Sequence, residues 1–301
     1  MTISTLAAAY LFFGGVGAGT LFFAVLAGRK GVTSSTVPLA STQPSCSMVS
    51  RISTRGMAVG LVMLAIGVIC LVFDLGRPNL ALLLFVNPTW SFMTVGAYLL
   101  VALMLLSGLL LAITACGCEY RFGVALMVLR AMTLVCAVGV MAYTGLLLRD
   151  LRPIALWTSL WLPVLFVASS LAGGASLILL ASGIVDELPV IAGAMLEKFA
   201  RLDLVLVLVE VLTCALFFWQ VTATPLGAQG VEALLVGRWS ALFWGGFVLC
   251  GLAMPGLLDV FSLVRREKMQ PATALVAALC SVAGCFCLRM VLVLAGTHVM
   301  A

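Results

Sequence analysis

The chain has 301 residues, of which 64% are hydrophobic and 9% are charged. A water-soluble domain of this length does not need so many hydrophobic residues to fill one core, so the composition excludes that class and indicates lipid as the main solvent. The net charge of +5 reflects how Lys and Arg are distributed among loops, and it does not indicate a nucleic-acid-binding protein.

Long uncharged stretches predict membrane-spanning helices. Residues 1–28, 78–118 and 153–185 contain no Asp, Glu, Lys or Arg, and each stretch exceeds the roughly 20 residues that cross a bilayer as a helix. They lack the alternation of polar and apolar residues that marks transmembrane β-strands. No basic residue precedes the first apolar run, whereas Arg29 and Lys30 follow it, so we expect a retained helix instead of a cleaved signal.

Breaks at Gly, Pro and charged residues divide the chain into eight apolar spans. In chain order, the predicted spans are residues 6–27, 56–73, 92–114, 122–148, 156–184, 202–221, 239–264 and 272–296. Residues 31–50 are rich in Ser, Thr and Pro without apolar periodicity, which predicts a loop. We therefore expect an all-α polytopic membrane protein, with residues 1–301 forming one integral membrane domain of two four-helix bundles.

Two patches of small residues suggest an internal repeat. Residues 13–19 (Phe-Gly-Gly-Val-Gly-Ala-Gly) lie in the first span, and residues 169–175 (Ser-Ser-Leu-Ala-Gly-Gly-Ala) lie in the fifth. Small residues let helix backbones approach closely. Residues 1–152 and 153–301 are thus candidate repeat halves, and four spans in each half would give both halves the same orientation.

Lys and Arg are divided unequally between the two sets of loops. The first set contains Arg29, Lys30, Arg51, Arg55, Arg121, Lys198, Arg201, Arg265, Arg266 and Lys268, and the opposite set contains Arg77, Arg149, Arg152 and Arg238. Because cytoplasmic loops carry the excess of basic residues, the first set is predicted to face the cytoplasm. Both termini would then lie outside the cytoplasmic (inner) membrane of a bacterium.

The cysteines and the single histidine bear on bound metals. Seven of the ten cysteines lie within apolar spans, where they are expected to act as small apolar filler. Cys116 and Cys118 form a C-x-C pair, but a typical iron–sulfur cluster needs four thiolates. His298 is the only histidine and is expected to be solvated, whereas a bis-histidine haem needs two imidazoles. We expect no haem or iron–sulfur cluster in this chain, and a diffusible organic carrier for any redox function.

Ionisable side chains within lipid are costly, so each one is a candidate functional group. Tyr143 and Arg289 lie within about two turns of the outer ends of the fourth and eighth spans. Asp74 and Arg77 close the outer end of the second span. These four residues are predicted to form an outer polar cluster if their helices are neighbours. Alternatively, Tyr143 anchors its helix at the lipid headgroups, and Asp74 pairs with Arg77.

A second layer of ionisable residues lies deeper. Glu210 is near the middle of the sixth span, and Arg130 and Asp259 lie toward the cytoplasmic side. One interpretation is a proton route, because buried carboxylates can relay protons. The alternative is a buried ion pair between Arg130 and Glu210 or Asp259 that only fixes helix register.

Several motifs together resemble the NrfD/PsrC-like (polysulfide-reductase-type) family, over nearly the whole chain. Residues 73–78 (Phe-Asp-Leu-Gly-Arg-Pro) and 87–93 (Asn-Pro-Thr-Trp-Ser-Phe-Met), followed by Gly96, resemble the signature after the family's second helix. The central segment is matched by residues 143–148 (Tyr-Thr-Gly-Leu-Leu-Leu), Trp157, residues 162–166 (Leu-Pro-Val-Leu-Phe) and the small patch 169–175, and residues 10–19 and 288–296 also match.

The resemblance implies an eight-helix subunit that binds menaquinone or ubiquinone near the outer face. Such subunits contain no redox metal and exchange electrons with a ferredoxin-like iron–sulfur subunit, which commonly serves a molybdopterin catalytic subunit. Tyr143 is the best candidate donor to a quinone carbonyl, followed by Arg289 and Asp74. The sequence departs from the family in the first span: some members place a polar side chain there against the quinone, whereas this span offers only Tyr10, Thr20 and glycines.

The residue types fit this chemistry, because quinone reduction takes up two electrons and two protons. A tyrosine hydroxyl can hold a carbonyl, Asp74 can deliver protons, and a neighbouring arginine favours the reduced anion. We therefore expect a subunit of a quinone-dependent oxidoreductase that is inactive alone. The competing hypothesis is a secondary transporter or proton-translocating subunit without quinone chemistry, which small-residue helices with buried Glu210 and Asp259 also fit.

Overall fold

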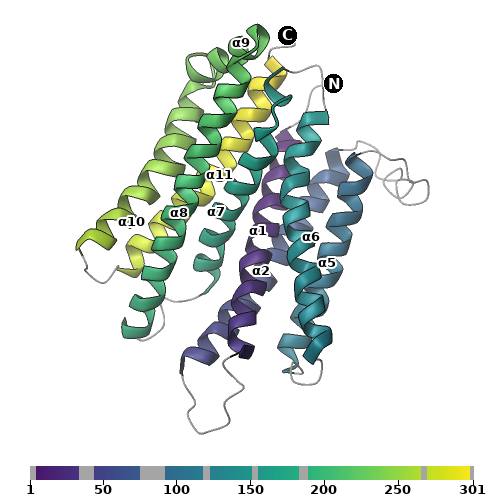
Figure 1. The fold of residues 1–301 in the computed structure, drawn as a ribbon, viewed down its shortest axis with the longest axis vertical. Helices are drawn as coiled ribbons and strands as arrows, with labels where there is room; N and C mark the ends of the chain where they lie inside the picture. The colour runs from purple at the N-terminus through teal and green to yellow at the C-terminus, as the bar shows by residue number, and fades with distance from the viewer. Residues whose placement is uncertain are drawn as a thin grey trace.

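The structure is a computed structural model that describes residues 5–33, 44–74, 92–117, 123–150, 155–182, 189–265 and 270–298. All regular elements in these ranges are helical, and eight helical segments are long and apolar enough to cross a membrane. The predicted all-α fold with eight spans is thus confirmed (Figure 1).

The spans follow one another in alternating directions. They are α1 (Thr5–Thr33), α2 (Pro44–Asp74), α5 (Phe92–Ala115), α6 (Gly123–Asp150), α7 (Trp161–Ser182), α8 (Pro189–Thr222), the joined helices η5 (Leu242–Ala253) and α10 (Met254–Arg265), and α11 (Pro271–His298). A 3₁₀ turn, η3 (Ala155–Trp157), precedes α7, and a short helix, α9 (Pro225–Leu235), follows α8. We call the end at which α1 begins and α11 finishes the upper end, as drawn in Figure 1.

The predicted loop over residues 31–50 was wrong at both of its ends. Helix α1 continues to Thr33, and α2 already begins at Pro44. Similarly, α8 begins at Pro189 and not at residue 202. Proline fits the first turn of a helix because the amide hydrogen that it lacks has no partner there. At the lower end, α8 contains Glu197 and Arg201, which form an ion pair one turn apart, so helix persists beyond the apolar span.

The fifth span starts later than predicted. Helix α7 begins at Trp161 because the Ser159 hydroxyl oxygen accepts the Trp161 N–H at 3.1 Å and so caps the first turn. The side-chain oxygen of Gln220 on α8 in turn accepts the Ser159 hydroxyl at 2.7 Å and the Leu160 N–H at 3.1 Å. Apolar composition alone does not reveal such a cap.

The seventh span begins as a π-helix, in which the Met254 N–H donates to the Leu249 carbonyl five residues earlier. Its Gly251 packs against Gly284 of α11, and a Cβ added to Gly251 would lie 2.7 Å from the Gly284 Cα. Glycine at both positions permits this close backbone approach.

Helix α1 lies at the centre of the packing and contacts α2, α6, α7 and α11. The two predicted small-residue patches meet where α1 crosses α7. A Cβ added to Gly174 would lie 2.6 Å from the Thr20 nitrogen and 2.7 Å from the Gly19 Cα. The patches thus allow close backbone approach as predicted. The two repeat halves stay a prediction.

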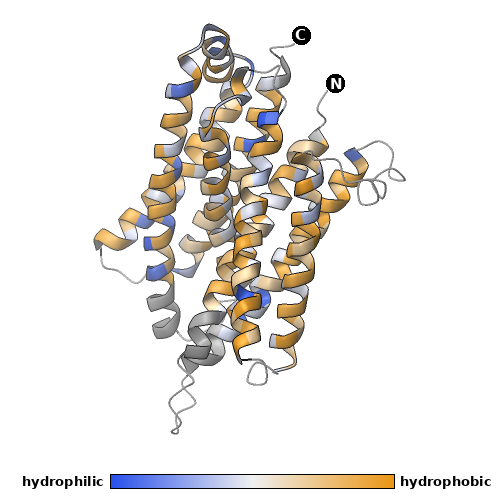
Figure 2. Cartoon of the chain, turned by 45° about the vertical axis from the view of Figure 1, so that its right-hand side comes forward, coloured by the Kyte–Doolittle hydropathy of each residue, from blue (hydrophilic) through white to orange (hydrophobic). Residues whose placement is uncertain are grey.

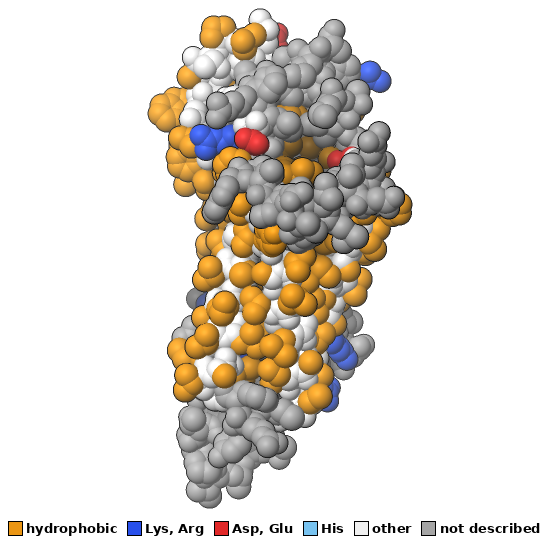
Figure 3. All heavy atoms as spheres, turned by 90° about the vertical axis from the view of Figure 1, so that its right-hand side faces the viewer, with side chains coloured by type: hydrophobic (Ala, Val, Ile, Leu, Met, Phe, Trp, Pro, Cys, Tyr) orange, Lys and Arg blue, Asp and Glu red, His pale blue; other side chains and the backbone are white. Residues whose placement is uncertain are grey.

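Apolar residues dominate the lengths of the helices (Figure 2). The face shown in Figure 3 carries mainly hydrophobic side chains across its middle. Exposed large residues on these spans include Leu105, Val135, Leu208 and Trp219, each more than half exposed. Such a surface is suited to contact with lipid acyl chains.

Candidate functional site

Two tyrosines meet in the upper half of the protein. Tyr143 on α6 is only 3% exposed, and Tyr10 on α1 is 1% exposed. The ring of Tyr143 lies so close to Gly96 of α5 that a Cβ there would overlap it. Tyr143 is therefore packed between helices, which does not match the alternative of a headgroup anchor.

The tyrosine hydroxyls are the notable polar atoms of this region. They lie near enough to interact with each other, yet neither meets the geometry of a hydrogen bond with any residue that the structure describes. Buried hydroxyl groups are nearly always hydrogen-bonded. Two orphaned donors side by side therefore indicate a place where a polar group of a ligand can bind.

A cavity lies above the tyrosine pair at the upper end. Its volume is about 510 Å³, and its described lining includes Phe92, Leu146, Arg149, Asp150 and Thr158. Phe92 precedes Gly96 by about one turn of α5, and Leu146 follows Tyr143 by about one turn of α6. The cavity thus lies about one helical turn from Tyr143 along α6, and its described lining combines apolar and charged side chains without including either tyrosine.

Asp74 and Arg77 were predicted in the same cluster. Asp74 is exposed at the upper end of α2. Arg77 lies outside the residues that the structure describes.

Arg289 of α11 is fully buried where α1, α7 and α11 meet. Its Nε donates to the Leu11 carbonyl at 3.2 Å. Its Nη1 donates to the Ser169 hydroxyl at 3.1 Å and the Cys285 carbonyl at 3.0 Å. Its Nη2 donates to the Ser170 hydroxyl at 2.7 Å and the Phe166 carbonyl at 3.5 Å. These bonds account for all five guanidinium N–H donors.

Arg289 and the tyrosine pair are linked through α1. Leu11, whose carbonyl accepts from Arg289, directly follows Tyr10 in the chain. Tyr143 lies against Tyr10, and Arg289 binds the carbonyl of the next residue, so both side chains contact the same turn of α1. Arg289 acts on this region by its charge and by fixing α1, because its donors are already engaged.

Glu210 of α8 faces the Arg289 network from the other side. It is 3% exposed, and its side chain interacts with Ser169 and with the charge of Arg289. Its Oε1 has no hydrogen-bond partner among the described residues. A buried carboxylate oxygen without a partner is costly, which indicates a functional role or a bound polar group.

Asp259 of α10 belongs to a lower group. It lies beside Asp203 of α8, and the two carboxyl groups interact with each other. Asp203 was not predicted as a site residue. It precedes Glu210 by seven residues, which places both on one face of α8, so helical periodicity could have identified it.

Arg130 is the third residue of the predicted deeper layer. It is buried on α6, and its Nη2 lies 3.8 Å from where a Cβ on Gly28 of α1 would be. Glu210 interacts electrostatically with Arg289, and Asp259 interacts electrostatically with Asp203. A buried pair between Arg130 and Glu210 or Asp259 stays a prediction.

Metal-ligating residues are scattered in the described part of the chain, where no three His, Cys, Asp or Glu side chains gather as a metal site. Cys116 is exposed at the end of α5. Cys118 and the side chain of His298 lie outside the described residues. Cys285 is buried beside Ser169 and donates to the Ser169 carbonyl at 2.9 Å, so it makes a polar contact that the prediction of apolar filler did not include.

Comparison with known proteins identifies relatives along the whole sequence. A family model described as "Polysulphide reductase, NrfD" matches residues 3–301. The C subunit of the polysulfide reductase of Wolinella succinogenes is 31% identical over 311 aligned residues, which cover 96% of the present sequence and 92% of that protein. Protein NrfD of Escherichia coli is 33% identical over 174 residues, covering 56% of the present sequence and 52% of that protein. The protein therefore belongs to the NrfD family of polysulfide reductase membrane subunits, as its sequence motifs indicated.

Proposed function

We propose that this protein is the quinone-binding membrane subunit of a respiratory oxidoreductase, with its quinone site at the upper end. The observation that carries the proposal is the pair of buried, unpartnered hydroxyls of Tyr10 and Tyr143. The cavity of about 510 Å³ above them falls within the usual size range of small-molecule sites.

The residues present fit a quinone ring. When bound, a quinone supplies a carrier of two electrons and two protons. Tyr143 is the proposed donor to a carbonyl oxygen, and Tyr10 offers a second hydroxyl beside it. Arg289, which binds the Leu11 carbonyl next to Tyr10, contributes positive charge. This charge favours an anionic ligand in a low-dielectric site. Asp74 and Arg77 are the proposed polar groups at the mouth, where protons exchange with water.

The partners and orientation are proposed from the relatives and the charge distribution. The related Wolinella protein is named as one part of a reductase, so we propose that the present protein also works within a complex. Its expected partners are a ferredoxin-like iron–sulfur subunit and a molybdopterin catalytic subunit, docked at the upper end. The loops and helix ends predicted on the lower side carry ten Lys and Arg residues against four on the upper side, which favours a cytoplasmic lower end in a bacterial inner membrane.

Proton transfer is the second part of the proposal. Glu210 and Asp259 are buried carboxylates on neighbouring helices, and each has an oxygen without a partner among the described residues. With Arg130 nearer the lower end, they are candidates to move protons along the interior. Buried carboxylates of this kind would also suit the competing hypothesis of a proton-translocating subunit without a quinone.

Substitution of the tyrosines tests the quinone site. Tyr143→Phe and Tyr10→Phe each delete one hydroxyl and almost no volume. We expect quinol-linked turnover of the intact complex to fall about fivefold or more in Tyr143→Phe, because one hydrogen bond at the reacting group is worth roughly 1 kcal/mol or more. The matched control is Tyr98→Phe on α5, whose side chain is 42% exposed.

Assembly is measured in the same membranes by copurification of the partner subunits. Wild-type turnover in both Tyr10→Phe and Tyr143→Phe would exclude these hydroxyls from the site. Active transport of a solute by the isolated subunit, with no copurifying quinone, would favour the transporter hypothesis instead.

A further inference from the structure

Helices α7 and α8 place paired polar side chains at two levels of the membrane. Ser169 of α7 interacts with Glu210 of α8, and Ser176 of α7 interacts with Asp203 of α8. Because the helices are antiparallel, moving seven residues forward on α7 matches moving seven residues back on α8, so both pairs fit one alignment of the two helices. The levels are seven residues apart, which is about 10 Å along a helix.

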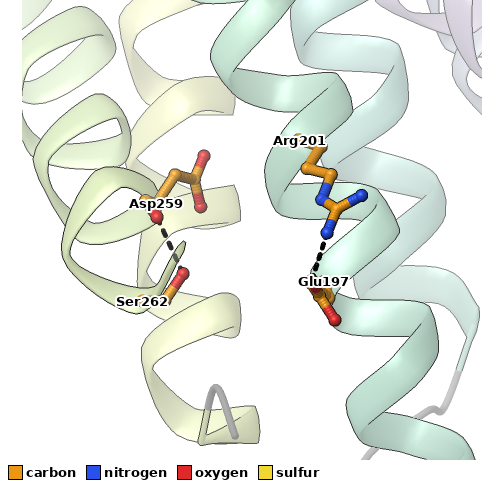
Figure 4. Close-up of polar contacts among 4 residues, drawn as sticks. All are labelled: Glu197, Arg201, Asp259 and Ser262. Atoms are coloured by element: carbon orange, nitrogen blue, oxygen red, sulfur yellow. Dashed lines mark hydrogen bonds and ion pairs between the residues drawn. The ribbon is translucent and has the colours of Figure 1, made fainter. Parts of the chain in front are cut away.

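Asp259 joins the lower level from α10. Its side chain is 2% exposed, and Figure 4 shows its carboxyl group directed away from α10 toward α8. Asp203 Oδ1 and Asp259 Oδ2 are both buried without a hydrogen-bond partner among the described residues. Both aspartates line a small cavity of about 20 Å³, which is enough room for one water molecule.

The surroundings of this carboxyl pair are otherwise apolar. From α7 the cavity receives Ser176 as its only hydroxyl group in the described lining, and from α11 it receives Ala274, Ala277 and Ala278. Glu197 and Arg201 of α8 form an ion pair with each other at the exposed side of the helix. Among the described residues, no cation thus faces Asp203 and Asp259 within the cavity.

A lone proton fits this site better than a metal ion. Hard cations such as Ca²⁺ take six to eight oxygen ligands, whereas the described lining offers only the oxygens of Ser176, Asp203 and Asp259. Two adjacent carboxylates in apolar surroundings repel each other unless a proton lies between them. We propose that Asp203 and Asp259 form a carboxyl pair that holds one exchangeable proton, with Ser176 as its third polar contact.

Ser281 of α11 is a candidate intermediate between the carboxyl pair and Glu210. Ser281 of α11 is 3% exposed, and it lies one turn above Ala277 and one turn below Cys285, on the same face of α11. A proton that leaves the pair can therefore pass Ser281 to reach Glu210 beside Ser169. This inference rests on the proton-transfer part of the proposed function and is independent of the quinone site.

Infrared spectroscopy of the purified complex tests the proposal directly. A protonated carboxyl group has a separate C=O stretching band that shifts to lower frequency in D₂O. Aspartate labelled with ¹³C at the carboxyl carbon shifts this band for aspartates alone, so no substitution is needed to detect it. We expect the wild-type complex at neutral pH to show one aspartate-derived band, because an aspartate side chain in contact with water is ordinarily ionised at that pH.

Variants assign that band. Asp203→Asn with Asp259→Asn is expected to remove it, Ser176→Ala to shift its frequency, and Glu197→Gln, an exposed carboxylate on the same helix, to leave it unchanged. A wild-type complex without a ¹³C-sensitive band, or a band that survives in the double variant, would overturn the proposal. Loss of the band on adding NaCl, but not choline chloride, would also overturn it and assign a sodium site. Since no quinone is required, the result is separate from the outcome of Tyr143→Phe.

Discussion

Gly174 lies where α1 crosses α7, and it offers a sharp test of the packing. In Gly174→Ala the new Cβ would lie 2.6 Å from the Thr20 nitrogen and 2.7 Å from the Gly19 Cα. The Gly19 carbonyl carbon would lie closer still, and ordinary contacts begin at 3.4 Å, so α1 and α7 must separate by more than about 0.8 Å. The obstructing atoms belong to backbone, so no side-chain rotation relieves the overlap.

The magnitude follows from two opposing effects. Overpacking a tight contact costs about 1–3 kcal/mol, and we take the upper value because both helices must move as units. Replacing glycine by alanine within a helix returns up to about 1 kcal/mol. We expect Gly174→Ala to lower the free energy of unfolding by about 2 kcal/mol.

The assay is a titration with a denaturing detergent, followed by circular dichroism. The matched control is Gly108→Ala on α5, where a Cβ would meet nothing within 4 Å, so stability should stay the same or rise slightly. If Gly174→Ala proves as stable as Gly108→Ala, the close approach of α1 and α7 is refuted.

Three further substitutions test the site. Gly96→Ala should displace the Tyr143 ring and lower quinol-linked turnover with little loss of assembly, whereas Gly139→Ala, where a Cβ would lie 3.5 Å from its nearest neighbour, should leave turnover intact; equal turnover in both variants would contradict the contact. Arg289→Lys offers three donors in place of five, so we expect the unfolding free energy to fall by about 1–3 kcal/mol in the same detergent titration; an unchanged value would show that its bonds contribute nothing. Glu210→Gln should lower the proton yield per quinol in reconstituted vesicles, and a normal rate with a normal yield would leave Glu210 as a structural residue.

Much of the fold could be predicted from apolar runs alone, because a bilayer demands that each span be long, apolar and helical. The helix ends could not be predicted in this way. Pro44 and Pro189 begin helices beyond the apolar core, where water replaces lipid and hydrophobicity carries no signal. Helix α9 is capped by the Thr224 hydroxyl, which accepts the Gly227 N–H at 3.3 Å. It was missed because it is short and follows a span directly.

The candidate site could be predicted in part. Tyr143 and Glu210 stood out because polar groups are rare in such spans, and both are buried in the structure. The partner of each could not be predicted, because pairing depends on which helices pack together. Charge alone suggested Arg130 for Glu210, and the packing of α7, α8 and α11 supplies Arg289. The unpartnered hydroxyl of Tyr10 likewise became visible only once α1 lay against α6.

The Arg289 contacts have a consequence for biogenesis. The acceptors of its side chain on other helices come from α1 and α7, which a ribosome completes before α11. Placing an arginine alone in hydrocarbon costs much free energy. Here α1 and α7 supply carbonyl and hydroxyl oxygens that can accept its hydrogen bonds as it inserts. We therefore expect α11 to insert against helices that have already packed together. Its membrane integration should then depend on α1 and α7. Cells that lack a correctly packed α1 should degrade the protein at this late stage.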